Sequence, residues 1–234
     1  GSTDKSGEII DEFVNIDSRF IKINRNNGGA SAARNSGLDV AKGQYIFMMD
    51  HDDLIPKYAL QKLLEAAIEF NAEMSRGRFM MIPEDFKLNQ LPPISLENSK
   101  PLFFQSPLLD FYKIARRKYK GWSYIWLCLF KKSSIENIRF LEELWSGGED
   151  NLFLFDVVSQ IKNFVQISDV VACHRYSKTS VTLNCYNPAL FIRISEITIP
   201  YIYKKYVLDP NVDKRLLWWV YHKKANTMYR YLVR

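Results

Sequence analysis

The amino-acid sequence predicts an α/β protein in which helices flank a mostly parallel central sheet. Residues 45–49 are apolar without interruption, which is typical of a strand buried on both faces of a parallel sheet. Apolar residues then recur at helical spacing through 57–70, and residues 74–82 predict a second strand. The chain has 234 residues, of which 47% are apolar and 25% charged, as in globular proteins with a substantial core.

Two helices and a short strand are expected ahead of residue 45. Asp4 is a suitable N-cap for a first helix through 8–13, and the alternating residues 20–24 predict a strand. After a glycine loop, Ser31 is a suitable cap for a second helix that ends near Ala41. These elements lead the chain into the buried strand.

The second half of the chain predicts a further set of elements beyond a proline-rich, polar segment at 83–107. That segment is expected to be a boundary between lobes or a loop over a site. The elements expected after it are a helix at 107–118, a buried strand at 124–131, a short helix from residue 133 or 134, a helix after 149, closing strands at 164–167 and 170–176, and helices at 190–206 and 213–232.

An acidic cluster follows the first buried strand directly. In open α/β sheets, ligands bind beyond the carboxyl ends of the strands. If the chain stays extended past residue 49, Asp50 and Asp52 point to the same side, and two carboxylates there suit Mg²⁺ or Mn²⁺ carried on a diphosphate. The alternative is a polar turn in which Asp52 or Asp53 caps the helix that Pro56 opens.

Three further positions are candidates for a site, and each has a structural alternative. Arg34 adds a positive charge near a helix N-terminus, which favours a phosphate or nucleotide; otherwise it is a surface residue beside a tight helix–sheet contact. Glu149 and Asp150 follow two glycines in a first helical turn, where the dipole keeps carboxylates ionised, so Asp150 is either a general base or a cap. His174 is either a metal or phosphate ligand or a structural histidine.

The charge distribution indicates what kind of partner to expect. Residues 204–234 hold eight Lys or Arg and two Asp, an excess equal to the whole net charge of +6. The rest of the chain is neutral and has no nucleic-acid-binding motif, so nucleic acid is not expected as a partner. Aromatic and basic residues mixed through 214–224 suit an interfacial helix on an anionic membrane surface; the alternative is a helix packed under the body or in a homodimer.

The cysteines and the apolar runs bear on the compartment. The three cysteines include no C-x-x-C pair, which favours a reducing cytoplasm. The longest apolar run, residues 124–130, is far shorter than the ~20 residues that cross a bilayer. We therefore expect a cytoplasmic protein that binds peripherally, if at all, at the inner face of the plasma membrane.

Five motifs in order resemble those of family 2 glycosyltransferases of the GT-A fold. They are residues 1–6 (similar to D-G-S-T-D-x-S from its second residue on), 27–38 (N-x-G-x-x-x-A-R-N-x-G-L), 50–53 (D-x-D-D), 126–140 (W-x5-K and I-R-F) and 148–150 (G-E-D). The resemblance implies a Rossmann-like GT-A sheet. The family's opening strand-helix-strand has no counterpart here, so the chain is expected to be N-terminally incomplete.

The resemblance also implies a division of the chain. Residues 1–82 would be the remainder of the nucleotide-sugar-binding half, residues 83–182 the acceptor-side half, and residues 183–234 a basic, aromatic helical extension. In the first of these, Asp50 and Asp52 would hold the divalent cation, and Arg34 and Asp53 would lie at the nucleotide.

In the acceptor-side half, the resemblance implies that Asp150 is the base, with Glu149 and Trp126 on the acceptor side and His174 as a further metal ligand. The implied reaction is inverting transfer from a nucleotide-diphosphate sugar, UDP-linked by preference, to a glycan or lipid-linked hydroxyl in cell-surface polysaccharide synthesis. The alternatives are a catalytically silent glycan- or nucleotide-binding module, and a sugar-phosphate nucleotidyltransferase, which would not need Glu149 and Asp150.

Overall fold

The computed structural model describes residues 1–87, 100–105, 124–144, 147–176 and 188–208. Within these residues, five strands form one sheet in the order β1-β4-β2-β5-β3. The strands are β1 (Tyr45–Phe47), β2 (Met74–Ile82), β3 (Leu102–Phe104), β4 (Cys128–Lys131) and β5 (Phe164–Arg175). Strands β2 and β5 pair in parallel, whereas the other three neighbouring pairs are antiparallel.

The α/β class is confirmed, but the sheet is mixed where a mostly parallel one was expected. Strands β1, β2 and β5 point in one direction, yet β4 runs the opposite way between β1 and β2. Strand β3 was not predicted. The direction of β4 was missed because an apolar run indicates that a strand is buried and does not indicate the direction of its neighbours.

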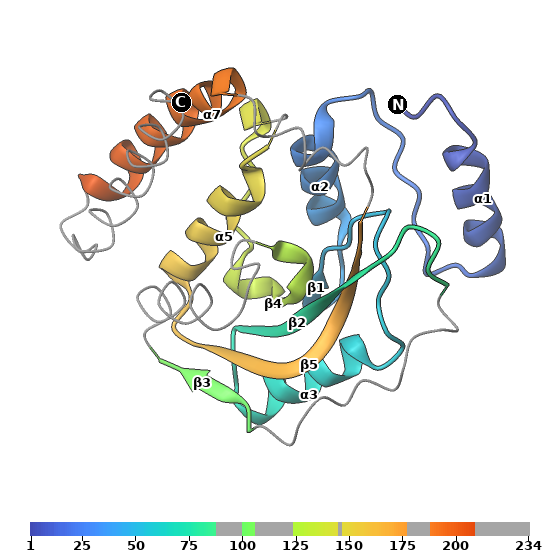
Figure 1. Cartoon of the computed structure of the whole chain (residues 1–234), viewed down its shortest axis with the longest axis horizontal. Helices are drawn as coiled ribbons and strands as arrows, with labels where there is room; N and C mark the ends of the chain where they lie inside the picture. Colours follow the sequence, from blue (N-terminus) through green and yellow to red (C-terminus); the bar gives the residue numbers. More distant parts are fainter. Residues whose placement is uncertain (88–99, 106–123, 145–146, 177–187, 209–234) are drawn as a thin grey trace.

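The helices lie on both sides of this sheet. They are α1 (Ser6–Ile16), α2 (Gly29–Val40), α3 (Ala59–Glu69), α5 (Glu149–Gln160) and α7 (Pro188–Ile202), which continues into a π-helical turn (Tyr203–Val207). Short 3-10 turns occupy Ile125–Leu127, Lys132–Ser134 and Glu142–Leu144. Helix α3 lies along one side of the strands and α2 and α5 along the other, while α1 lies apart from the sheet (Figure 1).

Most predicted helices are confirmed, with small differences at their starts. Helix α1 begins at Ser6 with Lys5 as its N-cap, so Asp4, whose Oδ1 accepts from the Ser6 N–H at 3.0 Å, lies one residue before the cap position expected for it. Helix α2 begins at Gly29, so Ser31 lies buried inside its first turn instead of capping it. The short helix expected after residue 132 is a single 3-10 turn. The predicted helices at 107–118 and 213–232 lie outside the described residues.

Two predicted strands differ from expectation because of their neighbours. Residues 20–24 form no strand, and Phe20 and Ile21 are 51% and 59% exposed. An alternating pattern produces a strand only where another backbone pairs with it. Strand β1 is shorter than the run at 45–49 and half-buried, because it lies at an edge of the described sheet.

The predicted closing strands at 164–167 and 170–176 are one strand, β5, and the strand expected at 124–131 starts only at Cys128. The turn-like residues between the two predicted pieces form a bulge: β5 advances from Gln166 to Val170 while β2 advances two residues. A Cβ on Gly77 of β2 would lie 2.4 Å from Val171 Cγ1, so a glycine lets the two strands approach here.

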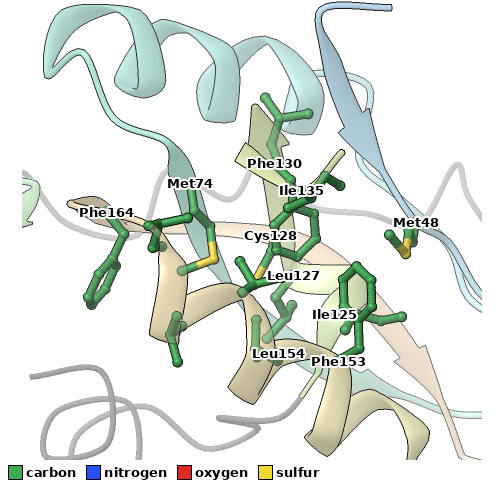
Figure 2. Close-up of a cluster of buried hydrophobic side chains, with 14 of the residues drawn as sticks. Met48, Met74, Ile125, Leu127, Cys128, Phe130, Ile135, Phe153, Leu154 and Phe164 are labelled. Carbon is green, nitrogen blue, oxygen red and sulfur yellow. The ribbon is translucent and has the colours of Figure 1, made fainter. Parts of the chain in front are cut away.

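The main core packs both α3 and α5 against the sheet, and Figure 2 shows the part that contains Phe153 and Leu154 of α5. Phe130 of β4 and Phe153 of α5 are almost fully buried and meet edge to face, with ring centroids 6.0 Å apart. Phe153 also stacks on Phe140 at 4.0 Å. This packing fixes α5 against the sheet, and with it the position of the helix N-terminus. None of the helices in the described part is long and apolar enough to cross a membrane.

Candidate active site

The acidic cluster lies just beyond β1, as predicted, but in a turn. The Asp53 N–H donates to the Asp50 carbonyl at 3.3 Å, and the chain bends at residues 51–52. The expectation that Asp50 and Asp52 share a side of an extended strand is therefore wrong, because strand alternation ends where the turn begins. What brings the predicted residues together is instead a set of side-chain contacts.

One arginine collects three of the predicted carboxylates. Arg34 of α2 donates from Nη2 to Asp50 Oδ1 at 2.8 Å. Its Nη1 donates to Glu149 Oε1 at 3.0 Å and to Asp150 Oδ1 at 2.9 Å. The guanidinium carbon also lies 5.3 Å from the centre of the Phe140 ring. Arg34 thus joins the end of β1 to the start of α5, more than a hundred residues later in the chain.

The N-terminus of α5 is placed by backbone that favours glycine. Gly148 caps the helix with φ of +84°, in the left-handed region. A Cβ at this position would also lie 2.9 Å from Ile194 Cγ2 of α7. Glu149 and Asp150 follow in the first turn, as predicted.

Asn35 holds α2 beside the segment that supports Arg34. Its Nδ2 donates to the Phe140 carbonyl at 2.9 Å, and its Oδ1 accepts from the Phe140 N–H at 2.8 Å. Asn35 is only 9% exposed, so these bonds replace those that water would make. The sequence interpretation gave Asn35 no role, although its place beside Arg34 in the motif at 27–38 was a usable signal.

The electrostatics of Asp150 differ from the expectation that the helix dipole keeps it ionised. Burial, with smaller contributions from the charges of Glu149 and Asp50, raises the pKa of Asp150 to about 7, and Arg34 only partly opposes this shift. For Arg34, burial lowers the pKa, but Asp150, Asp50 and Glu149 together outweigh it and raise that pKa. Asp150 is therefore poised between its two protonation states near neutral pH, which suits a general base.

A second cluster holds His174. Its Nδ1 lies 3.0 and 3.2 Å from the two carboxylate oxygens of Asp53, which also accepts the Arg175 N–H at 3.0 Å. The hydrogen bond with Asp53 raises the pKa of His174. Asp53, only 4% exposed, orients the imidazole and leaves Nε2 for another partner, as second carboxylates do behind metal-bound histidines. A nucleotide contact by Asp53 stays a prediction.

Aromatic side chains support the same imidazole. The Trp126 ring stacks on His174, with centroids 5.4 Å apart, and on Tyr124, at 4.7 Å. Phe79 meets Trp126 edge to face at 5.4 Å. Trp126 is 4% exposed, which leaves it little surface for an acceptor and makes it a support for His174. An acceptor-side role for Trp126 stays a prediction.

The three predicted metal ligands are linked electrostatically but do not form a finished metal site. Among the described residues, no three His, Cys, Asp or Glu side chains form a ready metal-binding group. The charges of Asp52 and Asp50 nevertheless raise the pKa of His174, so the three groups share one electrostatic environment. Two carboxylates and an imidazole fit a cation such as Mn²⁺ whose remaining ligands come from a diphosphate.

Known proteins match this chain in both sequence and structure. The model of "Glycosyl transferase family 2" matches residues 1–136. EpsJ of Bacillus subtilis, an uncharacterised glycosyltransferase, is 28% identical over 81% of this chain and 54% of its own length. TarP of Staphylococcus aureus, a poly(ribitol-phosphate) β-N-acetylglucosaminyltransferase, is 27% identical over 84% of this chain and 58% of its own.

Solved structures of S. aureus TarS have the same fold. The complex of TarS residues 1–349 with UDP-GlcNAc has a TM-score of 0.58 at 17% identity, covering 83% of this chain and 55% of that one. The complex with UDP has a TM-score of 0.55 at 19% identity. These matches confirm the predicted GT-A-like fold. The chain spans a little over half the length of EpsJ and TarP. With its family model matched over more than half of its residues, the protein belongs to glycosyltransferase family 2.

Proposed function

We propose that the protein transfers a sugar from a nucleotide-diphosphate donor, a UDP-sugar by preference, to a hydroxyl of a glycan or lipid-linked acceptor, with inversion at the anomeric carbon. One observation carries the proposal: Arg34 holds the donor-side carboxylate Asp50 and the candidate base Asp150 on a single guanidinium. The complexes of TarS with UDP and UDP-GlcNAc favour a uridine nucleotide.

A divalent cation, Mg²⁺ or Mn²⁺, is part of this proposal. Asp50 and Asp52 would hold it, with His174 Nε2 as a third ligand, because Asp53 already occupies Nδ1. Asp52 is exposed, and its carboxylate has no hydrogen-bond partner in the described part of the chain, so it is free to turn toward a cation. Bound there with the donor, the cation would neutralise charge on the leaving diphosphate.

Asp150 is proposed to take the proton of the acceptor hydroxyl. The acceptor oxygen bonds to the anomeric carbon as the bond from that carbon to the diphosphate oxygen breaks, and the hydroxyl proton passes to the Asp150 carboxylate. Glu149 and Asp50 raise the proton affinity of this carboxylate, and partial burial limits its contact with water. Arg34 positions the carboxylate for the transfer.

The acceptor is proposed to be an anionic or lipid-linked glycan of the cell surface. TarP and the minor teichoic acid biosynthesis protein GgaB of Bacillus subtilis, which is 29% identical over 70% of this chain, are similar proteins whose names concern phosphate-rich polymers. The excess positive charge of residues 204–234 suits such an acceptor or an anionic membrane. Placement in the cytoplasm at the inner membrane face follows from this proposal.

Calorimetry with UDP and GDP, each with and without Mn²⁺, tests the donor site. We expect Mn²⁺-dependent binding of UDP that Asp52→Ala abolishes. Asp39→Ala is the matched control, because Asp39 is an exposed carboxylate that pairs with Arg139 and not with Arg34. Equal loss in both variants, or binding without Mn²⁺, would contradict the assignment of Asp52.

Turnover separates the transferase from its rivals. With a UDP-sugar and a phosphate-rich glycan acceptor, a transferase releases UDP and forms a glycosidic product. Release of pyrophosphate from a nucleoside triphosphate and a sugar phosphate would identify a nucleotidyltransferase instead. Binding of UDP with no turnover of either kind would indicate a silent binding module.

A further inference from the structure

Arg34 serves two sides of the proposed reaction at once. Its Nη2 donates to Asp50, a candidate cation ligand. Its Nη1 donates to Asp150, the candidate base, and to the neighbouring Glu149. Both terminal nitrogens are therefore occupied by carboxylates. One guanidinium charge faces three acidic side chains, so the contacts compete for it.

These contacts are shielded enough to matter energetically. The side chains of Arg34, Glu149 and Asp150 are 17%, 15% and 20% exposed, and that of Asp50 is 34% exposed. Ion pairs with this degree of burial are less screened than surface pairs, which contribute little. Asp50, the most exposed of the three carboxylates, is the one that a cation from solvent reaches most easily.

The two groups of contacts are anchored differently. Glu149 and Asp150 belong to the first turn of α5, whose N-cap Gly148 lies against Ile194. Asp50 belongs to a turn beyond an edge strand. Phe140, held by Asn35, supports the guanidinium itself. If Asp50 leaves Arg34 to bind a cation, Arg34 therefore stays with Glu149 and Asp150 of α5.

We infer that Arg34 is a positioning residue that competes with the divalent cation for Asp50, so that loading of the cation transfers Arg34 wholly to Glu149 and Asp150. The inference rests on the proposed function for the role of Asp50 as a cation ligand. By thermodynamic reciprocity, an Arg34 that favours Asp50 weakens cation binding, and a bound cation weakens the contact between Arg34 and Asp50. This role differs from the nucleotide contact expected from the sequence.

Titration of Mn²⁺ without nucleotide tests the competition. Arg34→Met keeps most of the side-chain bulk and removes the charge. We expect it to bind Mn²⁺ about tenfold more tightly than the unaltered protein, the factor that corresponds to one modest, partly shielded ion pair. A residue that only contacts the nucleotide would leave the affinity for Mn²⁺ alone unchanged, and that result, or weaker binding, would overturn the inference.

Two further variants keep the test decisive. Arg139→Met removes an equal charge from the exposed pair with Asp39 and should leave Mn²⁺ affinity unchanged. Arg34→Lys retains the charge but cannot present two nitrogens at once, so it should tighten Mn²⁺ binding by a smaller factor. If circular dichroism shows that Arg34→Met is unfolded, Arg34→Lys decides the matter, and unchanged affinity in that variant overturns the inference.

Kinetics and UDP binding separate this inference from the proposed function. With transfer measured, Arg34→Met should lower kcat much more than it raises KM for the donor, because the base loses its position while the cation site is retained. If the unaltered protein binds UDP with Mn²⁺ but Arg34→Met binds Mn²⁺ no more tightly, only the competition fails. If the unaltered protein binds UDP with no help from Mn²⁺, the proposed metal-dependent function fails.

Discussion

Helix α5 carries two shielded aspartates whose surroundings differ, and the difference separates the carboxylate proposed as the base from a structural one. Asp156, 2% exposed, accepts hydrogen bonds from Tyr201 Oη at 2.6 Å, from Lys205 Nζ at 2.8 Å and from the Tyr206 hydroxyl. Asp150, six residues earlier, shares one guanidinium with two other carboxylates. The number of donors per carboxylate, more than burial, distinguishes the two sites.

The donors at Asp156 also tie the C-terminal helix to the site. Burial, followed by the neighbouring Asp156, raises the pKa of Tyr206, and burial together with hydrogen bonding to Asp156 raises the pKa of Tyr201, so both hydroxyls stay protonated and donate. These bonds join α7 and its π-helical turn to α5. Because Ile194 of α7 also leaves no room for a Cβ on Gly148, the structural aspartate helps to hold the helix that carries the proposed base.

Replacement of the proposed base should have the largest effect on activity. Asp150→Asn keeps the shape and removes the base, so kcat should fall by about 10²–10⁴-fold. The melting temperature should not fall, because the variant relieves repulsion among Asp50, Glu149 and Asp150 around Arg34. Rates of sugar transfer and thermal melts measure the two effects, with Asp39→Asn as control. A variant that keeps its activity would remove Asp150 from the mechanism.

Replacement of the structural aspartate should act on stability instead. Asp156→Ala leaves the two tyrosine hydroxyls and Lys205 without their acceptor, which should lower the free energy of unfolding by about 2–3 kcal/mol. Asp156→Asn, which retains an acceptor oxygen, should lose less. Urea unfolding of both variants measures this, and equal stability of Asp156→Ala and the unaltered protein would contradict the role assigned to the cluster.

A substitution at Gly148 should strain the packing of α7 against the start of α5, which connects Asp156 with Asp150. Gly148→Ala should cost about 1–2 kcal/mol of stability from its left-handed φ alone, and its Cβ meets Ile194. The first turn of α5 should shift and reduce kcat several-fold with a smaller change in donor KM. Ile194→Ala in the same chain should restore part of the activity. If it restores none, the contact between α7 and Gly148 does not place the base.

The pH dependence should include a step that belongs to Asp150, beside that of His174, whose pKa is also raised. The pKa of Asp150 is raised to about 7 from an ordinary value of 3.8, so the base form is lost as pH falls below 7, and kcat/KM should rise with pH up to that point. The contribution of Asp150 to the free energy of unfolding changes with pH in the opposite direction. The folded state binds the proton more tightly, so this group favours folding at low pH and loses that contribution as pH rises from about 4 to 7.

Melts across this pH range should show the stability slope in the unaltered protein. The slope should be much smaller in Asp150→Asn, where groups such as His174 still titrate, and unchanged in Asp39→Asn. An undiminished slope in Asp150→Asn would assign the titration to another group.

The sequence predicted the residues of the site better than their arrangement. Local pattern made Arg34, Asp50 and Asp150 candidates with structural alternatives, the family resemblance gave them roles, and the structure brings all three together. Their common contact was not foreseen, since it joins segments more than a hundred residues apart. The pairing of Asp53 with His174 was missed for the same reason, and the protonation of Asp150 was misjudged because burial acts more strongly than the helix dipole.

The sequence by itself determined the local features of this protein: the helices with their apolar faces, the long strand β2, the glycines before α5 and the family motifs. These depend on spacing and residue type within a few turns of chain. Only the tertiary structure decided the direction of β4, the continuity of β5 and the sharing of one guanidinium by three carboxylates. Strand pairing and desolvation arise between distant segments, so no local pattern records them.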